Sequence, residues 1–143
     1  MRRVCALALV GLLVPGCSSP AWDERDYELQ AAASAEAVGS TVEAVRLAVG
    51  GGGRLTRPYL TVLLTNAAEQ VRDVNDRFGA VQPPSGRAEA LGGRLLEIGG
   101  RAEKAVSGLL VQVRRDRVED PAGAARELAG LGESLRRFQD EHE

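Results

Sequence analysis

From residue 60 to residue 81 the sequence repeats apolar side chains at alternating intervals of four and three residues. The series consists of Leu60, Leu64, Ala67, Val71, Val74, Phe78 and Val81. Because an α-helix completes a turn every 3.6 residues, residues at these intervals share one face of a helix. The segment therefore predicts an amphipathic helix whose apolar face needs other helices to cover it.

Three further segments carry the same spacing, and none shows the alternation of apolar and polar residues that marks a half-buried strand. The segment before residue 50 is the weakest of them. The apolar positions are Ala31, Ala35, Val38, Val42, Val45 and Val49 in the first segment, Leu91, Leu95, Ile98, Ala102, Ala105 and Leu109 in the third, and Ala124, Leu128, Leu131, Leu135 and Phe138 in the fourth. We therefore predict an all-α protein.

Residues typical of helix ends separate the four segments. Four glycines follow the first segment, Ser85 and Asp120 are suitable N-cap residues, and Pro58 and Pro121 fall in first turns, where a missing N–H costs little. The predicted helices span residues 24–49, 57–80, 86–118 and 121–140.

Short connections favour antiparallel neighbours, so the predicted architecture is an up-down-up-down four-helix bundle formed by residues 24–143. The alternative is a three-helix bundle with a bent or frayed first helix. In either case the helical part has the size of one domain.

The third predicted helix contains an internal repeat, GRAEALG, GRLLEIG and GRAEKAV, with one heptad in each unit. Its glycines do not match a phosphate-binding loop, which requires a preceding strand and a Lys-Ser/Thr pair. Instead, we expect Gly92 and Gly99, which flank the apolar positions, to let a neighbouring helix approach. Gly93 and Gly100 lie outside and only weaken the helix, by roughly 0.5–1 kcal/mol each relative to alanine.

The same repeat places Arg87, Arg94 and Arg101 beside the apolar face. One interpretation is an anion-binding stripe. The other is that the arginine stems cover the edge of the core and their guanidinium groups pair with nearby carboxylates.

A second basic cluster, RRDR, contains Arg114, Arg115 and Arg117. Near a helix C-terminus these arginines complement the helix dipole and can bind the last carbonyls. They could alternatively contact anionic headgroups or an acidic partner, although the cluster is smaller than the 4–8 residues typical of a lipid-binding patch.

Residues suited to catalysis or metal binding are scarce. His142 is the single histidine and lies next to the last residue, in a tail expected to fray. The chain has no Gly-x-Ser-x-Gly motif, and its formal net charge of −2 does not suit nucleic-acid binding. We therefore predict a protein that is not an enzyme, with no metal site, no cofactor and no nucleic-acid partner.

The N-terminus has the pattern of an export signal: Arg2 and Arg3 precede an apolar run at residues 4–14. This run is far shorter than the ~20 residues needed to span a bilayer. Val14, Pro15, Gly16 and Cys17 follow the order of the lipobox, so this stretch resembles the signal peptide of bacterial lipoproteins. Pro15 is a departure, because alanine or serine is usual there.

The resemblance implies that residues 1–16 are removed and that Cys17 receives a diacylglyceryl group, with palmitate as a typical acyl chain. Residues 17–23 then tether the bundle to the outer face of the cell membrane. Two acyl chains hold a protein to a bilayer far more firmly than one chain, which binds only reversibly. Lys104 is the only lysine, a bias similar to that of proteins from GC-rich genomes such as those of actinobacteria.

Two functions remain open at this point. The first is a membrane-anchored extracytoplasmic lipoprotein that binds a protein partner in the cell envelope, with self-association as a further possibility. The alternative is a binding protein for a small hydrophobic or anionic ligand between the helices, with Arg87, Arg94 or Arg101 contacting an anion.

Replacing Cys17 with alanine should abolish incorporation of labelled fatty acid and leave the precursor uncleaved, because no thiol remains to accept the lipid. Metabolic labelling followed by electrophoresis checks this. Cys5→Ala is the matched control and should be labelled like the wild type, since Cys5 lies in the segment to be removed. Labelling of the Cys17→Ala variant would contradict the assignment.

Overall fold

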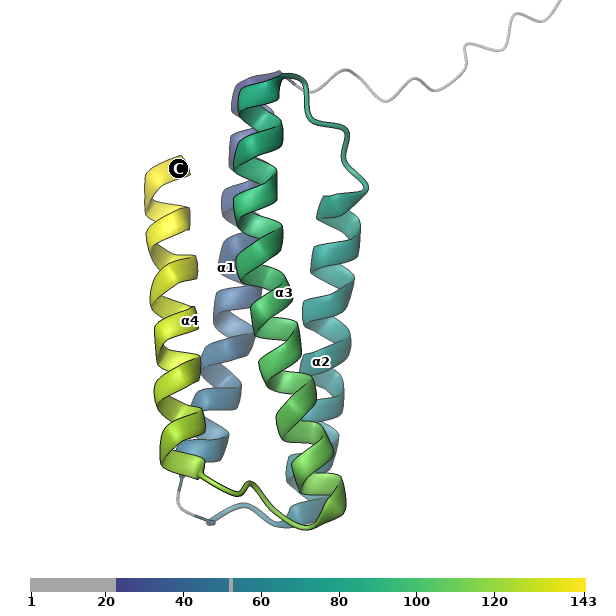
Figure 1. Cartoon of the computed structure of the whole chain (residues 1–143), viewed down its shortest axis with the longest axis vertical. Coiled ribbons are helices and arrows are strands. Elements are labelled where there is room, and N and C mark those ends of the chain that lie inside the picture. The colour runs from purple at the N-terminus through teal and green to yellow at the C-terminus, as the bar shows by residue number, and fades with distance from the viewer. Residues whose placement is uncertain (1–22, 52) are drawn as a thin grey trace, which may run out of the picture.

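The computed structural model describes residues 23–51 and 53–143 of the chain, so the predicted signal peptide and Cys17 lie outside the described residues. The described part forms four α-helices and no strand. The helices are α1 (Glu24–Gly50), α2 (Arg57–Gly79), α3 (Gly86–Arg115) and α4 (Pro121–His142). They run alternately up and down (Figure 1), which confirms the predicted four-helix bundle.

We name the two ends of the bundle by the segments that meet there. The proximal end holds the first residues of α1 and α3 and the last residues of α2 and α4; the distal end holds residues 51, 53–56 and 116–120 (Figure 1). A hydrogen bond from the Ser85 hydroxyl to the Glu24 carboxylate joins the starts of α3 and α1. The described chain therefore begins, at Asp23, at the proximal end.

The predicted N-caps are confirmed. The Ser85 hydroxyl accepts a hydrogen bond from the Ala88 N–H at 3.2 Å, and the Asp120 carboxylate accepts one from the Gly123 N–H at 2.9 Å. Such bonds satisfy N–H groups that a helix start leaves without a partner.

Two predicted helix ends are wrong. The third helix was expected to continue to residue 118, but α3 ends at Arg115, and Val118 in the following linker turns its side chain into the core. The fourth was expected to end at residue 140, but α4 continues to His142. Burial of Val118 from the linker accompanies the earlier end of α3, and a hydrogen bond from Arg25 of α1 to the Glu143 carbonyl holds the last turn of α4.

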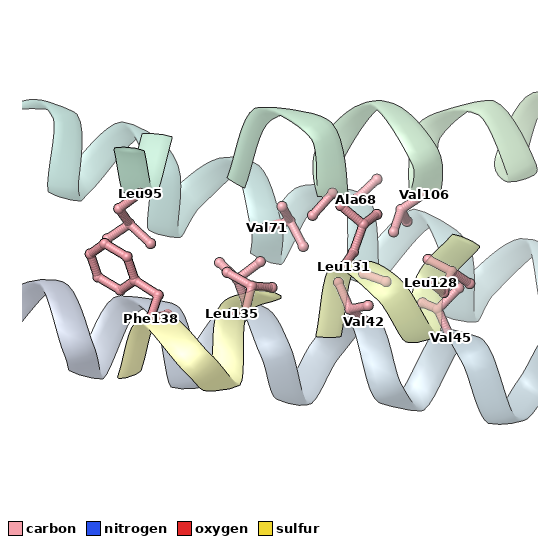
Figure 2. Close-up of a cluster of buried hydrophobic side chains, with 14 of the residues drawn as sticks. Val42, Val45, Ala68, Val71, Leu95, Val106, Leu128, Leu131, Leu135 and Phe138 are labelled. Atoms are coloured by element: carbon pink, nitrogen blue, oxygen red, sulfur yellow. The ribbon is translucent and has the colours of Figure 1, made fainter. Parts of the chain in front are cut away.

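Most of the predicted apolar positions lie in the hydrophobic core (Figure 2), which also contains residues that were not predicted, among them Tyr27, Ala68 and Val106. The six predicted positions of the first helix are all buried, and α1 contacts each of the other three helices. The alternative with a frayed first helix is therefore wrong. α1 is central because its alanines and valines let the neighbouring helices approach closely.

The four helices are not equivalent in the cross-section of the bundle. Among the described residues no Cα atom of α2 lies within 8 Å of one of α4, whereas the backbones of α1 and α3, on the other diagonal, do approach within that distance. Tyr27 from α1 lies against Gly92 of α3 and packs on Phe78 of α2, with ring centroids 5.2 Å apart. Burial raises the pKa of the Tyr27 hydroxyl, and the charge of Glu89 raises it further.

The prediction that Gly92 and Gly99 face neighbouring helices is confirmed. A Cβ atom at Gly92 would collide with the Tyr27 hydroxyl, and one at Gly99 would collide with the Asn75 side chain of α2. Cβ atoms at Gly93 and Gly100 would meet nothing within 4 Å. The space above each inner glycine is thus occupied by one side chain of another helix.

Gly92→Ala and Gly93→Ala form a matched pair that tests this packing. We expect Gly93→Ala to stabilise the protein by about 0.5–1 kcal/mol, because alanine favours the helix. Gly92→Ala should destabilise it by about 1–3 kcal/mol, because the buried Tyr27 ring cannot move aside without strain. Equilibrium denaturation gives both values. A stabilising effect of similar size in both variants would show that the packing of Tyr27 does not require a residue without a side chain at position 92.

Candidate interaction surface

A groove of about 450 Å³ runs along the bundle between α1 and α2. None of the residues that line it is charged, in a chain of which 27% is Asp, Glu, Lys or Arg. They are Ser40, Thr41, Ala44, Val45, Tyr59, Val62, Leu63, Asn66, Ala67 and Gln70. We call this feature the α1–α2 groove.

Three exposed apolar side chains accompany the groove. Tyr59 and Val62, which line it, are 56% and 61% exposed, and Leu47, one helical turn from Ala44 on α1, is 60% exposed. Single exposed apolar residues are ordinary on a protein surface, but a group beside an uncharged depression is typical of an interaction site.

The helix sequences explain the shape of the groove. α1 contributes Ser40, Thr41 and Ala44, whose side chains are too short to fill the space between the two helices. The Thr41 hydroxyl donates to the Ala37 carbonyl at 3.0 Å, so it needs no further acceptor. Tyr59 and Val62 on α2 then form the opposite wall, and the groove keeps an apolar surface with amide groups at Asn66 and Gln70.

The neighbouring groove between α1 and α4 has a different character, because charged residues line it. Two of its three acids are paired within their own helix: Glu43 with Arg46, and Glu133 with Arg136, both at 2.6 Å. The hydrogen bond from the arginine lowers the pKa of each of these two carboxyl groups. Charges already paired in this way favour a solvated surface over a docking site.

The three arginines of the α3 repeat lie in different surroundings. Arg87 lies 3.7 Å from the Glu28 carboxylate of α1, and Arg94 lies 3.0 Å from that of Glu141 on α4. The Arg94 guanidinium also lies over the Phe138 ring, 5.7 Å from its centroid. Arg101 lines a separate depression between α3 and α4.

Arg114, Arg115 and Arg117 all lie at the distal end, where a fourth arginine that sequence reasoning missed joins them. Arg57 of α2 donates from Nε to the Val113 carbonyl at 3.0 Å and from a terminal nitrogen to the Arg114 carbonyl at 2.6 Å. The last carbonyls of α3 are therefore bound from α2, and Arg114 instead donates to the Thr65 hydroxyl at 3.4 Å.

The expectation of a frayed C-terminal tail is wrong. The His142 side chain is 16% exposed, and its ring packs on that of Phe138 with centroids 4.6 Å apart. Arg25 of α1 donates to the Glu143 carbonyl at 2.9 Å. Contacts with α1 and α3 thus hold the end of α4 in the bundle.

No group of three or more His, Cys, Asp or Glu side chains suited to a metal ion occurs among the described residues. None of the four described helices is long and apolar enough to cross a membrane.

Comparisons with protein-family models, with curated proteins and with solved structures find no match to this chain.

Arg57→Ala should destabilise the bundle by about 1 kcal/mol, because two charge-assisted hydrogen bonds to the end of α3 are lost and water replaces them only in part. Chemical denaturation measures the loss, and hydrogen exchange should show faster opening of the last turn of α3. Arg54→Ala is the control: Arg54 is exposed and makes no hydrogen bond or ion pair with the described residues. Equal effects of both substitutions would contradict the capping role.

Proposed function

We propose that this protein is a membrane-anchored extracytoplasmic lipoprotein that binds a partner protein in the cell envelope through the α1–α2 groove and catalyses no reaction. The observation that carries the proposal is the groove itself, an uncharged depression flanked by exposed Leu47, Tyr59 and Val62. The anchored location rests on the lipobox-like residues ending at Cys17.

The position of the groove along the bundle suits an anchored protein. The tether enters at the proximal end, and Ala44 in the groove lies 20 residues along α1 from Glu24. At 1.5 Å per residue this separation is about 30 Å. A bundle standing on its tether would therefore offer the groove well above the lipid headgroups, where another envelope protein can reach it.

The chemistry of the groove also indicates the type of partner. Two parallel ridges with an apolar floor form a seat for a third helix, as in other helix-in-groove complexes. An uncharged lining favours an apolar helix stripe, since a charged side chain docked there would lose its water without gaining an opposite charge. We therefore propose that the partner presents an amphipathic helix whose contact stripe is apolar and uncharged.

Photo-crosslinking in intact cells tests this function. A photoreactive amino acid at position 62 of the lipidated protein should give one discrete adduct, because Val62 lies in the groove wall. The same amino acid at position 111 is the matched control: Val111 is 47% exposed but lies on α3, outside the groove. The adduct from position 62 should disappear when Tyr59→Glu is added.

The mass of the adduct decides between partners. An adduct that contains a different envelope protein supports the proposal. An adduct of twice the chain mass would show that the groove binds a second copy of this chain instead. Equal adducts from positions 62 and 111, or none from either, would overturn it. Circular dichroism of Tyr59→Glu confirms that the bundle is intact.

A further inference from the structure

The distal end of the bundle contains a second cavity, of about 190 Å³, which is separate from the α1–α2 groove. The end of α1, the start of α2, the end of α3 and both distal linkers contribute to its walls. The lining residues are Ala48, Val49, Gly53, Leu55, Arg57, Leu60, Val113, Asp116, Arg117, Val118 and Pro121. We call this feature the distal pocket.

The interior of the distal pocket is apolar. Leu55 and Val118 project from the two linkers, and Leu60 and Val113 come from α2 and α3. An apolar cavity of about 150 Å³ already suffices to bind benzene in another protein. The distal pocket is therefore large enough for a small apolar group, and it provides no polar floor that would hold water there.

The charged residues of the pocket are two arginines and one acid. Arg117 pairs with the Asp116 carboxylate at 3.1 Å, which leaves the charge of Arg57 without a carboxylate in the lining. Two backbone carbonyls of α3 hold the Arg57 guanidinium in place by hydrogen bonds. Residues 114–120 carry three arginines and three acids, so this segment adds no net charge beside the pocket. Arg57 is therefore the positive charge that the structure holds in place at the pocket.

We propose that the distal pocket binds an anionic amphiphile with a single apolar tail, the tail lying among Leu55, Leu60 and Val118 and the anionic head meeting Arg57. An apolar chamber beside fixed positive charge selects for this class: an uncharged apolar molecule lacks the ionic contact, and a simple anion lacks the burial. This ligand site does not depend on the partner proposed for the α1–α2 groove.

The acyl chains expected on the protein's own Cys17 do not belong to this ligand class. A diacylglyceryl group joined to sulfur carries no anionic head, so it offers nothing to the Arg57 guanidinium. The proposed ligand is therefore a separate molecule.

Photolabelling of the full, lipidated protein in native membranes provides the test. The probe is octanoic acid with a diazirine at the tail end, and 1-octanol with the same diazirine is the uncharged counterpart. We expect the acid to label the peptides around Leu60 and Val118 about tenfold more than the alcohol does, since one charge-assisted contact is worth about that factor. Unlabelled octanoic acid should compete.

Four variants make the result specific. Arg57→Gln should remove most of the preference for the acid over the alcohol, a ratio that a purely structural effect would not change, while Arg101→Gln, in a different depression of α3, should leave it unchanged. Val118→Trp should block labelling by filling the pocket, and Leu55→Trp, from the less buried linker, repeats that test if the first variant does not fold.

A matched octyl phosphate probe distinguishes the source of the ligand. Stronger labelling by the phosphate probe indicates a phospholipid-derived amphiphile, and stronger labelling by the carboxylate probe indicates a fatty acid. Either result supports an anionic amphiphile as the ligand. Equal labelling by acid and alcohol in the wild type, or labelling spread along the helices without competition, overturns the proposal. Neither outcome affects crosslinking from position 62, so the two proposals can fail separately.

Discussion

The packing of α1 is the constraint on which the other features depend. Ala31, Ala35, Val42 and Val45 have no exposed surface, and every other helix of the bundle touches α1. These side chains are small, so α3 and α4 can approach α1 closely and bury their leucines against it. The glycines of α3 would destabilise an isolated helix, and this burial offsets their cost.

The same use of small residues creates the open side of the bundle. On the α4 side of α1, short side chains meet leucines such as Leu135, whose Cβ lies 3.7 Å from the place a Cβ would take on Gly39. Short side chains such as Ser40 leave a groove on both flanks of α1. The two grooves differ in their lining, because α4 supplies charged residues on one flank, whereas α2 supplies Tyr59, Val62 and Leu63 on the other.

The two ends of the bundle differ in how their charged groups are paired. At the proximal end, pairs such as Arg94 with Glu141 and Arg25 with Glu143 tie the helix ends together. At the distal end, Arg57 is committed to backbone carbonyls, which neutralise no charge, and the linkers enclose an apolar pocket. If the protein is anchored as proposed, the α1–α2 groove forms a side face and the distal pocket a far end at which the proposed ligands can bind.

Local sequence patterns determined the number of helices, their apolar faces and their N-caps, because periodicity and capping depend on residues within a few positions of each other. They also identified Gly92 and Gly99 as inner residues. Tertiary structure alone decided that Arg57 caps α3, 56 residues away, that Arg25 of α1 holds the end of α4, and that the flank of Tyr59 and Val62 stays uncovered. The reason is that a helical pattern tells which face is apolar, whereas the distances between helices decide which part of that face is filled.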